Sequence, residues 1–335
     1  MLKHMIDNLD IFICPACRGT LKITGIEIEC LKCQNKYQIE NGIPLLFWPN
    51  AWDGLKKDVT NTVRLFYEET PFPNYEDFEN SGDLVQKAQT GIFARLLNEQ
   101  IPFNIRTLEV GCGIGQLSNF LGIAHRFVFG TDLCINSLKL AQDFKIQNNL
   151  ERVGFYQMNL FKPIFKEESF PLVICNGVIH HTSDPFAGFQ SISKLVKKGG
   201  YIIIGLYNKY GRITTDIRRA IFRAFGDRFK FLDTRLTRKD MSDVRKLTWF
   251  KDQYKNPHES KHTIGEVLSW FYQTGFDFIN GIPKPKAFEI FSENEKLFKL
   301  NPRGNWFDHF VVQACLAFTG NREGGFFLMI GTRKS

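Results

Sequence analysis

The amino-acid sequence predicts an α/β protein with a doubly wound sheet, preceded by a small cysteine-rich unit. From Arg106 onward, short apolar runs alternate with segments of helical length and pattern, which is typical of parallel strands joined by helices. Before them, two Cys-x2-Cys pairs lie within residues 11–47. Because 335 residues exceed what one compact core usually organises, we expect further pieces around the main domain.

The first unit, residues 1–49, holds both pairs: Cys14, Cys17, Cys30 and Cys33. Each pair aims two thiolates at one ion, and four sulfurs complete a closed tetrahedral zinc site. Since a closed site leaves no open coordination position, the zinc is expected to be structural. Four unrelated core thiols are the alternative, which Pro15 and Gly19 disfavour because they supply turn chemistry around the first pair.

Three stretches of this unit, the start ICPAC, the pair CLKC and the closing YQIENGIPLLF, resemble a known family. It is the zinc-ribbon family typified by the activator subunit of tRNA and translation-factor methyltransferases. The resemblance implies a methyltransferase nearby.

Residues 50–105 are expected to form a linker and an N-terminal helical lid. Pro71 and Pro73 break any helix within 66-FYEETPFPNYEDF-78. The aromatic side chains there fit either packing or contact with a substrate.

Residues 106–335 are expected to form the main domain. Strands are predicted at 106–112, 126–133, 153–160, 170–177, 199–208, 276–283 and 324–334, and helices at 116–122, 136–149, 184–196 and 263–275. Thr263 and Glu266 form a capping box at the start of the last helix. The final two strands give the sheet an antiparallel end, and insertions at 209–262 and 284–323 interrupt the alternation.

The stretch 109-EVGCGIGQL-117 places an acid and three glycines between a strand and a helix. Glycines let the backbone approach a ligand, and the helix offers its N-terminus. Gln116 occupies the third glycine position of a dinucleotide motif, which argues against a pyrophosphate ligand.

This stretch resembles motif I of the class I S-adenosylmethionine-dependent methyltransferases (type 11/12-like), whose sheet is Rossmann-like and seven-stranded. The resemblance runs from Arg106 to Tyr207 and resumes at Thr263. It implies S-adenosylmethionine as cofactor, with the ribose hydroxyls on Asp132 and with Asn159 where the family usually carries an acid for the adenine amino group. The implied cofactor residues are Glu109, Gly111, Cys112, Gly113, Gly115, Asp132, Leu133, Asn159, Leu160, Asn176 and Gly177.

Candidate catalytic residues follow the fourth and fifth predicted strands. The stretch 175-CNGVIHHTSDPF-186 resembles a VLHH–DP sequence common in the superfamily, which favours a turn beside the cofactor and leaves His181 as a candidate base. Adjacent histidines diverge in direction, which disfavours a metal role. Tyr254 and His258 are further candidates, because insertions after the fifth strand commonly cover the acceptor; helix-entry hydrogen bonding is their alternative.

The segment from Lys209 to Lys251 has thirteen basic and five acidic side chains, a net charge of +8 that equals the excess of the whole chain. It is either a solvated helix face or a surface for an anionic substrate, nucleic acid or acidic lipid headgroups. The acidic N-terminus does not fit a signal peptide, and no apolar run reaches the roughly 20 residues of a membrane span. A cytoplasmic protein is therefore expected.

The expected function is methyl transfer by proximity and orientation to a small-molecule or lipid-linked acceptor, at oxygen or carbon. No NPPY sequence follows the fourth strand, which disfavours amino methylation of adenine or glutamine. An apolar acceptor pocket is expected from Trp249, Tyr254, Trp270, Phe271, Trp306 and Phe307. The alternatives are an RNA (tRNA or rRNA) methyltransferase gripping phosphate with the basic insertion and the ribbon, and a non-catalytic cofactor-binding module. No obligate protein partner is evident.

Overall fold

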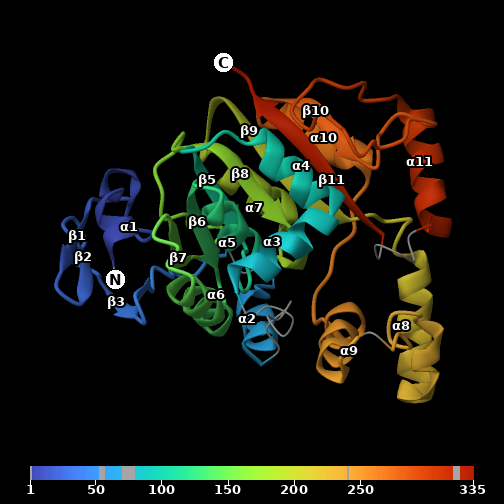
Figure 1. Cartoon of the computed structure of the whole chain (residues 1–335), viewed down its shortest axis with the longest axis horizontal. Helices are drawn as coiled ribbons and strands as arrows, with labels where there is room; N and C mark the ends of the chain where they lie inside the picture. Colours follow the sequence, from blue (N-terminus) through green and yellow to red (C-terminus); the bar gives the residue numbers. More distant parts are fainter. Residues whose placement is uncertain (1, 53–56, 70–79, 240, 320–324) are drawn as a thin grey trace.

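A seven-stranded sheet with the strand order β10-β11-β9-β8-β5-β6-β7 forms the centre of the computed structural model (Figure 1). The structure describes residues 2–52, 57–69, 80–239, 241–319 and 325–335. The strands are β5 (Arg106–Val110), β6 (Phe127–Asp132), β7 (Val153–Gln157), β8 (Phe170–Asn176), β9 (Val196–Tyr207), β10 (Phe276–Ile282) and β11 (Phe326–Arg333). Strands β5 to β9 run parallel, and β11 is antiparallel to both of its neighbours. The predicted fold class is confirmed.

Helices cover both faces of the sheet because neighbouring strand residues point in opposite directions. On β8, Val173 packs with one apolar cluster and Ile174 with the other. The first face carries α7 (Pro185–Ser193) and α10 (Ile264–Gln273). The second carries α3 (Ser81–Thr90), α4 (Ile92–Gln100), α5 (Gln116–Ile123) and α6 (Ile135–Gln147). Parallel strands buried on both faces read as continuous apolar runs, which made them predictable.

Helix boundaries follow local capping. The predicted capping box is present at α10, where the Thr263 hydroxyl accepts a hydrogen bond from the Glu266 N–H and the Glu266 carboxylate accepts one from the Thr263 N–H. Helix α7 starts with Asp184 as its N-cap and Pro185 in its first turn. It ends at Ser193, before the predicted end at residue 196, because β9 already starts at Val196.

The N-terminal unit is a four-stranded antiparallel sheet, β1 (Leu21–Thr24), β2 (Glu27–Cys30), β3 (Lys36–Glu40) and β4 (Ile43–Pro44), preceded by α1 (Lys3–Ile6) and a 3-10 turn (Leu9–Ile11). It lies against the β7 edge, where Leu45 pairs with Gln157 and Phe12 with Phe165. Phe12 also contacts Phe129 and Tyr156 of the large sheet. The unit thus shares the core of the main domain and covers an edge strand that would otherwise be open.

Helix α2 (Thr60–Glu69) lies across the start of α6. The Glu68 carboxylate accepts hydrogen bonds from the N–H groups of Ile135 and Asn136, at 2.9 and 3.0 Å, and so caps α6. In the predicted lid 66–78, residues 66–69 belong to α2, and residues 70–78 lie outside the part of the chain that the structure describes.

The basic insertion forms α8 (Ile213–Phe225), a 3-10 helix (Gly226–Leu232), α9 (Asp243–Phe250) and one π-helical turn (Lys251–Lys255), and the second insertion forms α11 (Trp306–Thr319). One of the thirteen basic side chains, Arg212, is buried. It pairs with Glu259, which also pairs with Arg219 at 3.2 Å. Glu259 therefore offsets part of the positive charge inside the fold.

Candidate active site

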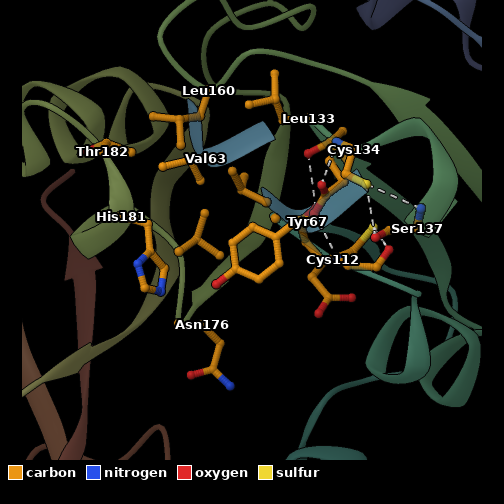
Figure 2. A pocket seen from close by; sticks show the side chains of 18 of the residues that line it. Val63, Tyr67, Cys112, Leu133, Cys134, Ser137, Leu160, Asn176, His181 and Thr182 are labelled. Carbon is orange, nitrogen blue, oxygen red and sulfur yellow. Dashed lines mark hydrogen bonds between the residues drawn. The ribbon is translucent and has the colours of Figure 1, made fainter. Parts of the chain in front are cut away.

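One cavity of about 440 Å³ lies at the carboxyl ends of β5, β6 and β8, beneath α2 (Figure 2). The strand order reverses between β6 and β8, which flank β5, and ligands of open α/β sheets bind at such a reversal. The volume is that of a small-molecule site. The lining includes every cofactor residue predicted from the sequence except Gly115: Glu109, Gly111, Cys112, Gly113, Asp132, Leu133, Asn159, Leu160, Asn176 and Gly177.

Two positions of the glycine turn have no room for a side chain. Gly111 has φ of 70°, and a Cβ there would lie 2.2 Å from the Val178 side chain. Gly115 precedes α5 with φ of 72°, and a Cβ there would lie 2.7 Å from Ala141 and Phe155. Gly115 therefore serves the packing of the turn on the domain, while Gly111 and Gly113 line the cavity.

Asp132 ties the glycine turn to the end of β6. Its two carboxylate oxygens accept hydrogen bonds from the N–H groups of Gly113 and Cys134, both at 2.8 Å. A carboxylate has about four acceptor positions, so both oxygens retain capacity for a ligand hydroxyl. Burial raises the pKa of Asp132, and it raises the pKa of Glu109, which accepts a hydrogen bond from Ser118, to about 7.

Asn159 lines the cavity, but its amide is already engaged. Its Nδ2 donates to the Trp48 carbonyl at 2.9 Å and to Asn50 Oδ1 at 2.7 Å, and its Oδ1 accepts from the Phe161 N–H at 3.1 Å. A carboxylate has no proton to donate to these two oxygens. This gives a structural reason for an asparagine at the position where the family usually carries an acid. Asn159 fastens the segment that follows the ribbon, at Trp48 and Asn50, to the large sheet.

His181 enters the cavity from the turn after β8 and points toward Tyr67 and Asn176 (Figure 2). Its Nδ1 lies 2.7 Å from the His258 carbonyl oxygen, so Nδ1 carries the proton and Nε2 keeps a lone pair in the neutral ring. Burial lowers the pKa of His181, against the charge of Asp252 and this hydrogen bond, which act to raise it. The geometry is that of a neutral imidazole able to accept a proton.

In the described structure, the ring of the other histidine of the pair has no hydrogen-bond partner, and only its backbone carbonyl accepts hydrogen bonds, from Ser260. His180 is buried with its ring centroid 4.5 Å from that of Tyr207, and neither of its nitrogens has a hydrogen-bond partner. Burial lowers its pKa well below the ordinary value. His180 is a packing residue.

The two later catalytic candidates lie outside the lining of this cavity. The His258 ring bonds the Thr182 carbonyl at 3.0 Å, and only its own carbonyl reaches His181. Tyr254 packs against Phe222 and Phe250, and its hydroxyl donates to Asp233 at 2.8 Å. We therefore correct the assignment of Tyr254 to the acceptor site: it belongs to the small core of the insertion.

The expected aromatic acceptor pocket is also absent from this cavity, since none of its six predicted side chains lines it. Trp270 and Phe271 pack on Phe189 beneath the sheet. Trp306 and Phe307 lie on the surface. Composition alone could not predict where each aromatic side chain lies, because aromatic residues occur in cores, on surfaces and in pockets.

Sequence reasoning missed the polar group opposite His181. Tyr67 of α2 donates its hydroxyl to Asp252 Oδ1 at 2.9 Å, and Gln253 Nε2 donates to Asp252 Oδ2 at 2.8 Å and to the Tyr207 hydroxyl at 2.9 Å. Tyr67, Tyr207 and Asp252 all line the cavity. The one indication of these residues in the sequence was that Tyr67 and Asp252 lie in segments already expected to cover the acceptor.

The four cysteines of the ribbon come together as predicted, with all sulfurs within 4.8 Å of one another. Sγ of Cys14 lies 3.7 Å from that of Cys33, and Sγ of Cys17 lies 3.5 Å from that of Cys30. Four sulfurs at about 2.3 Å from a zinc ion would be separated by roughly 3.8 Å. The cluster therefore fits a structural zinc ion, which would be held by these thiolates far from the glycine turn.

This sheet order, the glycine turn and the acid at the end of β6 are the arrangement expected from the resemblance to class I S-adenosylmethionine-dependent methyltransferases. Residues 108–204 match the family model of the methyltransferase domain. Among the described residues, no helix has the length and apolar character needed to cross a membrane.

Individual proteins are similar to this chain over part or most of its length. The ubiquinone biosynthesis O-methyltransferase of Leptothrix cholodnii is 30% identical over 106 residues, 31% of this chain and 45% of that protein. The enzyme of the same name from Haemophilus ducreyi is 29% identical over 111 residues, 32% of this chain and 47% of that protein. The chain thus spans less than half the length of these relatives. The structure of magnesium protoporphyrin IX methyltransferase from Synechocystis has a TM-score of 0.48 at 13% identity, covering 82% of this chain and 99% of that one.

Proposed function

We propose that the chain transfers a methyl group from S-adenosylmethionine to a hydroxyl oxygen of a small or lipid-linked molecule. The observation that carries this proposal is the His181 imidazole, which lines the cavity with Nδ1 fixed on the His258 carbonyl and Nε2 available as a base. A base is needed where the acceptor must lose a proton, as a hydroxyl does. The relatives named for O-methylation in ubiquinone biosynthesis support an oxygen acceptor.

The cofactor supplies an electrophilic methyl group when bound, so the chain's own part is to hold and deprotonate the acceptor. Asp132 and the glycine turn would hold the ribose and methionine parts of the cofactor. His181 Nε2 would take the hydroxyl proton, and the charge of Asp252, which raises the pKa of His181, would stabilise the imidazolium that results. Orientation of the acceptor in the cavity would supply much of the acceleration, up to about 7–11 kcal/mol. A carbon acid could be deprotonated by the same group.

The acceptor class is testable by label transfer. The protein is incubated with methyl-labelled S-adenosylmethionine and cell extract, with and without ribonuclease, and then separated into organic, small aqueous, RNA and protein fractions. We expect ribonuclease-resistant label in the organic or small aqueous fraction. Label in RNA that ribonuclease releases would instead establish the RNA alternative, and tight cofactor binding without label in any fraction would establish a binding module.

His181→Ala tests the base directly. We expect the rate to fall by roughly 10²–10⁴-fold with unchanged cofactor affinity. Because burial lowers the pKa of His181 below the ordinary 6.5, the wild-type rate should be constant through neutral pH and fall only on the acidic side, and the variant should lose this acidic limb. His258→Ala is the matched control: it keeps the backbone carbonyl that orients His181. A His181→Ala enzyme with the wild-type rate and pH profile would exclude the mechanism.

A further inference from the structure

Helix α8 carries an apolar stripe that faces solvent. Ile213, Ile217, Ile221 and Phe225 recur every fourth residue, which places them along one side of the helix. Ile217 is 55% exposed and Phe225 is 62% exposed. The opposite side is the packed one, where Phe222 contacts the rings of Phe250 and Tyr254. Within the stripe, Ile221 packs against the core of the insertion and Phe225 contacts the Phe229 ring, so the fold leaves chiefly the outer sides of Ile217 and Phe225 to solvent.

Helix α11 repeats this pattern. Trp306, Phe310, Ala314 and Phe318 are also spaced by four, and Trp306 and Phe318 are 78% and 85% exposed. The two helices share an anchor, because Asn208 Nδ2, just before α8, donates to Gln313 Oε1 of α11 at 3.1 Å. Both lie on the flank of the molecule opposite the ribbon (Figure 1).

The insertion that contains the α8 stripe is basic. Arg212 and Arg219 are turned inward onto Glu259, but Arg223, Arg228 and Lys239 of the same insertion lie at the surface. The insertion as a whole carries a net charge of +8. Exposed apolar stripes beside basic side chains are typical of helices that lie in the headgroup region of a membrane.

Charge and chemistry select among possible occupants. A second copy of the chain would bring one positive insertion against another. RNA would pair with the basic side chains but would leave the isoleucines without a partner, because protein contacts with bases use stacking rings or hydrogen-bonding groups. An anionic lipid surface satisfies both the apolar stripe and the positive charge.

We propose that α8 and α11 seat the protein on membranes that contain anionic lipids, with the two stripes at the boundary of headgroups and acyl chains. The insertion that contains α8 also reaches the cavity, because Asp252, which follows α9, lines it. A lipid-soluble acceptor would then reach the site from the bilayer. The membrane contact itself goes beyond the proposed reaction, and it requires neither cofactor nor turnover.

The test is co-sedimentation of the full chain with vesicles of phosphatidylcholine alone or mixed with phosphatidylglycerol. We expect binding to the anionic vesicles that weakens with salt and is much lower for the neutral ones. The double variant Ile217→Ser/Phe225→Ser should bind at least about tenfold more weakly, because both substitutions remove apolar surface from the membrane contact. The matched control Ile26→Ser changes a residue that is 79% exposed on the ribbon, and it should bind as wild type does.

Three outcomes would overturn the proposal. The first is equal sedimentation of wild type and the double variant, with circular dichroism showing both folded. The second is RNA binding with no vesicle binding. The third is a dimer in analytical ultracentrifugation that the double variant dissociates while vesicles bind neither form. Loss of methyl transfer in solution bears only on the proposed function, because vesicle binding is measured without cofactor.

Discussion

The two sides of the cavity are built differently. On the proposed cofactor side, the glycine turn and Asp132 lie within residues 109–134 and are joined by backbone N–H groups. On the proposed acceptor side, Tyr67, His181 and Asp252 come from three distant segments, and the Tyr67–Asp252 hydrogen bond spans 185 positions of sequence. A site formed by one strand-turn-helix unit can be recognised as a motif in the sequence. A site formed by residues from distant segments has no such motif.

Among three variants that compare the two sides, the largest effect is expected for Asp132→Ala, on the proposed cofactor side. Asp132→Ala removes the acceptor of two backbone hydrogen bonds, each worth about 1.5–3 kcal/mol when the partner is charged. We expect cofactor affinity, measured by calorimetry, to fall by roughly 100-fold or more. Asp132→Asn keeps one oxygen acceptor, and its cofactor affinity should lie between those of wild type and Asp132→Ala. Wild-type affinity in the Ala variant would contradict this description of the cofactor side, because the glycine turn would then not need the Asp132 side chain to hold it.

Asn159→Asp tests where the cofactor side ends. The carboxylate cannot donate to the Trp48 carbonyl or to Asn50, so we expect the free energy of unfolding to fall by about 1–3 kcal/mol in denaturant titrations. The same exchange at exposed Asn61 is the control and should change little. A variant that is as stable as wild type and binds cofactor more tightly would mean that Asn159 serves adenine recognition and not the ribbon.

Tyr67→Phe tests the acceptor side and has the smallest expected effect. Loss of the hydroxyl leaves Asp252 with one partner fewer, and we expect kcat/KM for the acceptor to fall about tenfold, equivalent to roughly 1.4 kcal/mol. Cofactor affinity should stay within about twofold, and Tyr210→Phe, at the surface, should behave as wild type. A loss of cofactor affinity with normal acceptor kinetics would mean that Tyr67 serves cofactor binding and not the acceptor.

Much of the fold could be predicted because its signals are local. Apolar runs such as 201–207 indicate strands buried on both faces, and Thr263 with Glu266 marks a helix start that the structure confirms. Tyr254 could not be placed in this way. Phe250 lies four residues earlier on the same helical stretch, but Phe222 and Asp233 become partners of Tyr254 only through the turns of the insertion, and no periodicity in the sequence indicates those contacts.

The class of sheet, the cysteine cluster and the glycine turn with its acid could be predicted from the sequence, because each depends on residues close together in the chain and on backbone geometry. The folded chain was needed to show that the ribbon shares the core of the sheet, that Asn159 fastens it there, and that Tyr67 and Asp252 face His181. It also decided which apolar residues stay outside, since burial depends on which surfaces the folded chain brings into contact. The physical reason is the same throughout: local rules act along the chain, whereas side-chain partners are selected across it.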